Sequence, residues 1–161
     1  YGIMNIDGDN NLQSANNSYG IFNNMPSGII NKNGSPSSQT YVSGITSFNN
    51  SGLINITSGN ISIDVAGAHS GIYNIGFGAG LQGAANLTFS GNSLTNNGAI
   101  TIFNFSFNGS AIQYLNGYGD IKKLTINNTV GVMLTETQAI KNSITVSPNG
   151  KLKVYRDLIV D

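Results

Sequence analysis

The sequence has few of the residues on which many protein functions depend. Its 161 residues include no Cys, no Trp, one His, 7 basic and 7 acidic side chains. The absence of Cys excludes a disulfide framework and thiolate metal sites. Nucleic acid binding through phosphate neutralisation needs clustered Lys and Arg, which a chain with 9% charged residues and no net charge does not provide.

Long hydrophobic runs are also missing. No charged residue lies between Asp64 and Asp120, yet Asn, Ser and Gly interrupt every apolar run before the roughly 18 residues that a membrane helix requires. We therefore expect no transmembrane span. No signal peptide is visible, and because the chain opens on Tyr1, any targeting segment is expected to be removed or to lie outside this sequence.

Amide, hydroxyl and glycine residues replace the missing charge. Asn (25), Ser (18), Thr (11) and Gly (21) fill 75 of the 161 positions. The chain also contains 20 Ile and 14 Phe or Tyr residues, too many apolar groups for a disordered polar linker. A folded chain with an uncharged polar surface is expected.

Apolar and polar residues alternate over the C-terminal third. From residue 124 to 160, 12 of the 19 even-numbered positions are apolar, against 4 of the 18 odd-numbered positions. This is the period of a β-strand with one buried face. Turn-forming residues interrupt the pattern every four to six residues, so we expect short strands that follow one another without helices.

A short phrase recurs upstream, in which a small turn residue and Gly precede alternating apolar residues. It reads SGLINI at 51–56, SGNISI at 58–63, NGAITI at 97–102 and NGKLKV at 149–154. The spacing of Gly52, Gly98 and Gly150 suits coils of roughly 23 to 26 residues, two per interval. We therefore predict an all-β fold, a right-handed parallel β-helix (β-solenoid), with a β-sandwich as the alternative.

A stack of coils also explains the high Asn content. An Asn at the same turn of each coil can hydrogen-bond through its side chain to the Asn above and below, whereas a charge there would repel its own repeat. We expect one solenoid segment over residues 1–161, with a soft sub-boundary near 117–120 where charged residues become frequent. A bulge or corner is predicted near Ile102 and Phe103, where the apolar set changes from even to odd positions.

One segment carries a weak signal for calcium. Asp7, Asp9 and Asn11 place oxygen side chains at alternate positions, like the start of an EF-hand loop. The twelfth position is Ser18 and not the bidentate Glu that completes such a loop. An Asx-rich turn is the favoured interpretation, and we expect no other metal or cofactor.

Further motifs are weaker. The GAGLQG sequence at 78–83 matches a dinucleotide pattern but leads into an expected strand, so close packing of small residues explains it better. His69 is expected to be a turn residue, because its neighbours form no nucleophile elbow. Asp64 is the only acid between Asp9 and Asp120, which leaves no evident carboxylate pair for polysaccharide cleavage. The sequence therefore predicts a protein that is not an enzyme.

Six tyrosines are candidates for stacking on sugars. They are Tyr1, Tyr19, Tyr41, Tyr73, Tyr114 and Tyr118. A solenoid can also use Tyr to fill a core corner or to cover an end, and we favour that use over carbohydrate binding.

Two stretches carry a resemblance to a known family. These are NSGLINITSGNISI at 50–63 and LTINNTVGVMLT at 124–135, the latter followed by ITVSPNGKLKV at 144–154. Over residues 50–160 the chain resembles the repetitive stretches of large secreted surface adhesins of Bacteroidetes, which are type IX secretion substrates; filamentous haemagglutinin-like proteins and phage tail fibres show similar patterns. The resemblance implies an extracellular, cell-surface, non-catalytic role in adhesion or fibre building. The resemblance assigns a function to no individual residue of this sequence, and the C-terminal secretion domain of the family is not visible in it.

The last strand of the pattern, LIVD at 158–161, has no capping segment after it. Because an open solenoid end exposes strand edges and core, we expect flanking coils of a longer chain, or a capping or assembly partner. Surface glycans are a further candidate partner. Two functions compete: a structural or adhesive module of an extracellular fibre, and a carbohydrate-binding or carbohydrate-cleaving β-helix.

Overall fold

The structure, a computed structural model, describes residues 2–14 and 19–161 and confirms the predicted β-solenoid. Parallel strands stack in about seven turns, and no helix occurs among the described residues. The β-sandwich alternative is wrong, because every strand pair is parallel whereas a sandwich is built from antiparallel strands.

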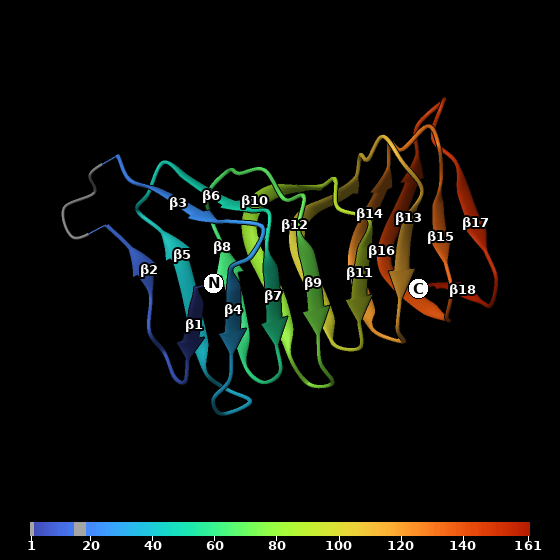
Figure 1. Cartoon of the computed structure of the whole chain (residues 1–161). Helices are drawn as coiled ribbons and strands as arrows, with labels where there is room; N and C mark the ends of the chain where they lie inside the picture. Colours follow the sequence, from blue (N-terminus) through green and yellow to red (C-terminus); the bar gives the residue numbers. More distant parts are fainter. Residues whose placement is uncertain (1, 15–18) are drawn as a thin grey trace.

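One sheet, here called sheet A, takes one strand from each coil, in order along the solenoid (Figure 1). Neighbouring strands are in register, so equivalent positions of successive coils form rows across the sheet. Its eight strands are β1 (Ile3–Ile6), β4 (Ile29–Lys32), β7 (Leu53–Ile56), β9 (Ile72–Ile75), β11 (Ser93–Asn96), β13 (Gln113–Asn116), β15 (Val132–Leu134) and β17 (Leu152–Val154).

A second eight-stranded sheet, sheet B, lies across the core from sheet A. Its strands are β2 (Leu12–Gln13), β5 (Gln39–Ser43), β8 (Asn60–Ile63), β10 (Gly80–Phe89), β12 (Ala99–Phe107), β14 (Asp120–Ile126), β16 (Gln138–Val146) and β18 (Leu158–Val160). A separate pair, β3 (Ile21–Asn24) with β6 (Ser47–Asn50), is connected through bridges at His69 to the second half of β10. The solenoid therefore has a third face, made of this pair and the C-terminal halves of the long strands.

The coils become shorter than the sequence pattern indicates. Successive coils are 26 residues apart at the start of the chain (Ile3 opposite Ile29) and 19 apart further on (Leu53 opposite Ile72). The predicted range of 23 to 26 residues is wrong for these later coils. Gly98 precedes β12 of sheet B, whereas the other two glycines of the pattern precede strands of sheet A, so the three do not mark equivalent corners.

The predicted corner near Ile102 and Phe103 is confirmed. Ile102 is buried before the corner, Phe105 and Phe107 are buried after it, and Phe103 points outward with 55% of its surface exposed. The pairing of β12 with both of its neighbours shifts register at this place. The composition change at 117–120 falls in the turn between β13 and β14, and strand pairing continues on both sides of it.

Aromatic rings line the core beneath the third face. The rings of this aromatic stack have neighbouring centroids 5.4 to 6.5 Å apart, a spacing at which ring pairs add to the stabilisation from burial. Its members are Phe22, Phe48, His69, Tyr73, Phe89, Phe105 and Phe107.

Asn side chains form the predicted ladder, on the outward positions of sheet A strands instead of at turns. Asn31 Nδ2 donates to Asn5 Oδ1 (3.0 Å), Asn55 Nδ2 donates to Asn31 Oδ1 (2.9 Å), and Asn74 Nδ2 donates to Asn55 Oδ1 (3.0 Å). We call these four residues the amide ladder. Asn31 and Asn55 each use both a donor and an acceptor, which no charged side chain could do in every coil.

Asn55→Asp is expected to lower the free energy of unfolding by about 1 kcal/mol. The substitution removes the donor to Asn31 and places a carboxylate oxygen beside another oxygen acceptor. Urea unfolding at neutral pH measures the change. The matched control is Asn149→Asp, in a turn where the Asn side chain makes no hydrogen bond to any residue that the structure describes. Equal effects of the two substitutions would show that the ladder adds nothing to stability.

Candidate functional site

The calcium candidate residues make hydrogen bonds along the edge of the second coil. Asp9 Oδ1 accepts from the Gln39 amide (2.7 Å), Asn11 Oδ1 accepts from the Tyr41 amide (3.0 Å), and Asp7 Oδ1 accepts from Asn33 Nδ2 (3.1 Å). Because β2 has only two residues, Asp9 and Asn11 supply the acceptors that a longer strand would offer to β5. Ser18, the twelfth position of the calcium pattern, lies outside the described residues.

The ammonium group of Lys32 supplies a positive charge in this region. Its side chain is fully buried, in a row between Ile6 and Ile56. Its Nζ donates to Gly8 O (2.6 Å), Ser38 Oγ (2.8 Å) and Asn33 O (3.1 Å). Burial lowers the pKa of the Lys32 ammonium, while the nearby carboxylates of Asp9 and Asp7 oppose that shift. The ammonium thus ties the 7–11 segment to the first corner of the next coil.

Lys32→Met is expected to destabilise the fold by about 2 kcal/mol, because it leaves buried hydrogen-bond acceptors without a donor. Lys151→Met, at an exposed position, is the control and is expected to change stability by less than about 0.5 kcal/mol. Thermal unfolding with and without added calcium measures both effects. A clear rise in the unfolding temperature of the wild type with calcium would favour a metal site in the 7–11 segment over this role of Lys32.

The glycine-rich GAGLQG segment serves close packing. Gly83 lies in β10 with φ of +136°, and a Cβ there would be 2.1 Å from the carbonyl oxygen of Ile63 in the preceding coil. A glycine is therefore required where these two coils approach each other. The segment forms a turn and a strand, without the helix that a dinucleotide site needs.

His69 is a core residue, and its prediction as a turn residue is wrong. The side chain is buried in the aromatic stack, in a row between Asn50 and Phe89, and His69 Nδ1 lies 2.6 Å from the Tyr73 hydroxyl. Burial lowers the pKa of the imidazole to about 4 and raises the pKa of the Tyr73 phenol. Among the described residues, Tyr73 is its only side-chain hydrogen-bond partner, so the pair has no nucleophile or carboxylate attached to it.

The carboxylate of Asp64 has a local structural role. It accepts from the Ala84 amide (2.9 Å) and from Ser62 Oγ (3.3 Å), which connects a corner of one coil to the next. Within residues 2–14 and 19–161, no group of three His, Cys, Asp or Glu side chains could hold a metal ion.

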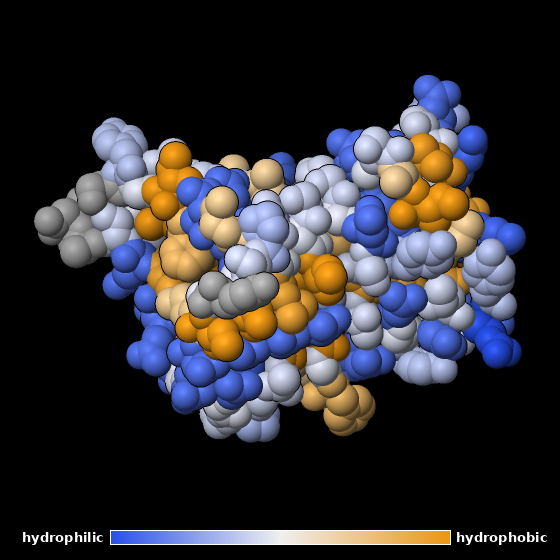
Figure 2. Space-filling model, viewed as in Figure 1, coloured by the Kyte–Doolittle hydropathy of each residue, from blue (hydrophilic) through white to orange (hydrophobic). Residues whose placement is uncertain are grey.

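The outer surface of sheet A consists of two regular rows. In the first row the N-terminal strands carry aliphatic side chains, which Figure 2 shows gathered over β1, β4 and β7. The second row begins with the four residues of the amide ladder and continues mainly with Thr and Asn. Lys153 is the only charged residue in either row, so the face is almost uncharged. The first row is Ile3, Ile29, Leu53, Ile72, Ser93, Tyr114, Met133 and Lys153, and the second is Asn5, Asn31, Asn55, Asn74, Thr95, Asn116, Thr135 and Tyr155.

A depression of about 600 Å³ opens in this surface near the C-terminal end, and we call it the tyrosine depression. It is lined by Tyr114, Met133, Thr135, Tyr155 and Arg156. Tyr155 is 52% exposed and Tyr114 is 40% exposed. The arrangement offers two exposed aromatic rings, a thioether, a hydroxyl and a guanidinium to a ligand.

Charged side chains surround the tyrosine depression. Lys153 Nζ lies 4.6 Å from the centroid of the Tyr155 ring, and the Tyr118 hydroxyl donates to Glu136 Oε2 (2.8 Å). This hydrogen bond raises the pKa of the Tyr118 phenol, and the positive charge of Arg156 acts in the opposite direction. Arg156 therefore lies close enough to this pair to influence it.

Of the six tyrosines that were candidates for stacking on sugars, one lies in the core and four lie on the surface. Tyr73 is buried, Tyr19, Tyr41, Tyr114 and Tyr118 are exposed, and Tyr1 lies outside the described residues. Tyr155, Met133 and Arg156 were not predicted as site residues. The alternation over 124–160 contains the signal for two of them, since residues 133 and 155 are apolar at odd, outward positions.

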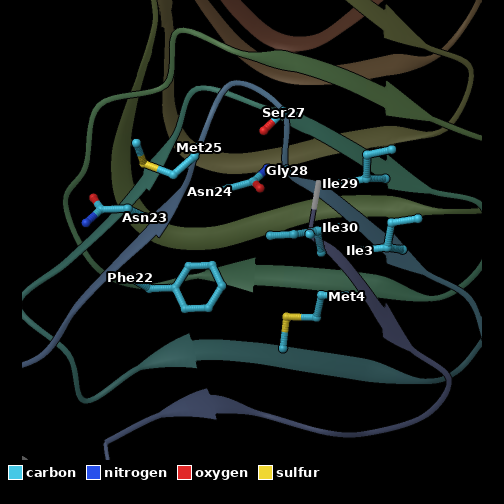
Figure 3. A pocket seen from close by; sticks show the side chains of 11 residues that line it. Ile3, Met4, Phe22, Asn23, Asn24, Met25, Ser27, Gly28, Ile29 and Ile30 are labelled. Atoms are coloured by element: carbon cyan, nitrogen blue, oxygen red, sulfur yellow. The ribbon is translucent and has the colours of Figure 1, made fainter.

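In the part of the chain that the structure describes, both ends of the solenoid are open. At the N-terminal end a cavity of about 410 Å³ is bounded by Met4, Phe22, Met25 and Ile30, among others, and Figure 3 shows Met4 and Phe22 projecting into the same space. At the other end, the valines and isoleucine of β17 and β18 are exposed. Each end thus presents apolar side chains and an unpaired strand edge.

None of the described residues forms a helix with the length and hydrophobicity needed to cross a membrane. Comparison of the chain with protein-family models, with curated proteins and with solved structures finds no match.

Proposed function

We propose that the chain is a non-catalytic structural and adhesive module of an extracellular bacterial surface or secreted fibre protein. The observation that carries this proposal is the outer face of sheet A, where two rows of aliphatic, amide and hydroxyl side chains run over eight strands with one charge. A flat face of this kind can contact another surface over many coils, each adding a small attraction.

The open ends support a role as one part of a longer stack. The N-terminal cavity beside Met4 and Phe22, and the exposed apolar residues of β17 and β18, would be covered by flanking coils or by an assembly partner. Covering each end buries apolar surface and pairs the free strand edge. Continuation of the stack would extend the same rows along a fibre.

Carbohydrate cleavage is the alternative, and the positions of the acids disfavour it. Asp64 is engaged at a corner by Ala84 and Ser62. Lys141 Nζ lies 2.7 Å from an Asp161 oxygen and 3.8 Å from an Asp120 oxygen, in an exposed group where the ammonium neutralises both carboxylates. A hydrolase needs one carboxylic acid that stays protonated beside a second, ionised one, whereas these two exposed carboxylates share one lysine ammonium.

An adhesion measurement under flow tests the proposal. Beads coated with the chain are passed over bacterial cells, immobilised polysaccharides and glass, and their retention is compared with uncoated beads. The double variant Ile29→Lys with Leu53→Lys puts two charges into the first row of sheet A. Its matched control is Thr88→Lys with Thr101→Lys, at exposed positions of β10 and β12 in sheet B.

We expect the wild type and the sheet B variant to be retained at least fivefold more than the sheet A variant on one of these surfaces. Equal retention of both variants, or no retention of the wild type on any surface, would contradict an adhesive role of this face. Release of reducing ends or unsaturated products from the polysaccharides would support the enzymatic alternative. An antibody raised against the chain should label intact cells of the source bacterium, and labelling only after permeabilisation would contradict the extracellular location.

A further inference from the structure

The tyrosine depression is bordered by two exposed aromatic side chains. Tyr114 belongs to β13 and Tyr155 follows β17, with β15 between them. Adjacent strands are about 4.8 Å apart, so the lines of β13 and β17 are separated by about 9.6 Å. Tyr155 lies two residues further along than Lys153, the residue in the row of Tyr114. Met133 and Thr135 of the intervening coil are half-buried and close the space below. The Tyr155 hydroxyl lies 3.8 Å from the Met133 sulfur, so this ring leans over the intervening coil. A hollow of about 600 Å³ has room for a pyranose ring against these aromatic side chains.

The depression also holds an unused anion-binding group. Arg156 is the only arginine of the chain, and its guanidinium makes no hydrogen bond or ion pair with the residues that the structure describes. The nearby carboxylate of Glu136 accepts the hydrogen bond of Tyr118, and Lys153 adds a second positive charge beside Tyr155. A guanidinium that is free of partners can bind a carboxylate through two parallel hydrogen bonds.

We propose that the tyrosine depression binds a carboxylate-bearing sugar, a uronic acid unit of an acidic polysaccharide, with Arg156 on the carboxylate and Tyr114 and Tyr155 against the ring. This assignment rests on the adhesive role proposed above and names the ligand class. The apolar C–H faces of the sugar contact the tyrosines, and its hydroxyls meet hydroxyl and amide side chains at the rim.

The polar residues around the depression favour a sugar over another anion. Thr135 Oγ1 donates to Asn116 Oδ1 (2.8 Å), so the Asn116 amide lies beside the site. Its row continues through Thr95 to the amide ladder along sheet A. A polysaccharide that places one acidic unit in the depression can extend along this row and exchange hydrogen bonds with it. An acidic peptide has no comparable series of hydroxyls.

Isothermal titration with tetragalacturonate tests the assignment, with maltotetraose as the neutral probe and short polyglutamate as the non-sugar anion. Arg156→Gln removes the charge but keeps a hydrogen-bonding side chain, and Tyr155→Ala removes one ring. The matched controls are Lys151→Gln and Tyr41→Ala, which change an exposed lysine and an exposed tyrosine outside the depression. All four positions are exposed, so circular dichroism should show every variant folded.

We expect tetragalacturonate to bind the wild type, and Arg156→Gln to weaken that binding about ten- to a hundredfold. Tyr155→Ala should weaken it to a similar extent, and the controls less than about twofold. Equal binding of maltotetraose or polyglutamate, no binding of tetragalacturonate at millimolar concentration, or no effect of Arg156→Gln would overturn the assignment. If the beads still adhere but the chain does not bind tetragalacturonate, only this ligand assignment is contradicted. If the chain binds tetragalacturonate but the beads do not adhere, the proposed adhesive function is contradicted.

Discussion

Phe107→Ala is expected to lower the free energy of unfolding by about 3 to 5 kcal/mol. The Phe107 ring is fully buried, and its centroid lies 5.5 Å from that of Phe89 and 5.4 Å from that of Phe105. Truncation removes apolar contacts on both sides and leaves a cavity where the stacked coils cannot close in, because hydrogen-bonded strands fix their spacing. Urea unfolding followed by circular dichroism measures the loss.

The same strand provides the control. Phe103→Ala changes the same residue type in β12, at the corner where the ring points outward and is 55% exposed. We expect this variant to lose less than about 1 kcal/mol, since most of the ring is already in contact with water. If the two substitutions cost the same, the corner of β12 would have to lie elsewhere than between Ile102 and Phe105.

The sequence was sufficient to predict the fold because two local signals agree. Alternation along the strands identifies the buried face, and the Gly-containing phrases mark the corners. The change from even to odd positions at Phe103 located a corner correctly within one strand. The high Asn content also predicted the amide ladder, because identical residues stacked in successive coils can hydrogen-bond if they are amides but repel each other if they are charged.

The coil length could not be predicted from the sequence in the same way. Phrases of one type begin strands in both sheets, so the distance between two of them need not be a whole number of coils. The length depends on which strands pair, and that depends on contacts between residues 18 to 30 positions apart. The burial of His69 and Lys32 has the same origin: each occupies an inward position of a row whose other members are apolar or amide residues in neighbouring coils.

The tyrosine depression illustrates what a single sequence can give about a site. Tyr114 was a candidate from its residue type, but its neighbours Met133 and Tyr155 are 19 and 41 positions away along the chain. Only the register of β13, β15 and β17 brings them together. Once the register is known, the outward positions of the three strands can be read off directly.

Lowering the pH from 7 to 4 is expected to destabilise the fold by about 3 kcal/mol through His69 alone. Burial lowers the pKa of His69 from its ordinary value of 6.5 to about 4. Between these values the unfolded chain binds a proton that the folded chain does not bind, so stability falls as the pH falls. The loss begins as the pH falls through 6.5 and levels off only below pH 4, where the folded protein also binds the proton. Urea unfolding at closely spaced pH values measures it.

A double variant separates His69 from the carboxylates that also titrate in acid. His69→Phe with Tyr73→Phe replaces both members of the 2.6 Å hydrogen bond by apolar rings of similar shape. Only the buried Asn50 side chain, which also hydrogen-bonds the Tyr73 hydroxyl, loses a partner. The inward row continues from His69 to the buried ring of Phe89, and a ring at position 69 is therefore compatible with the stack. We expect stability within about 2 kcal/mol of the wild type at pH 7, because of Asn50, and a much smaller loss at pH 4, so that the variant is the more stable protein in acid. Parallel pH profiles of the two proteins would mean that His69 is already protonated in the folded state or reaches solvent, and the aromatic stack would then have to open at its centre.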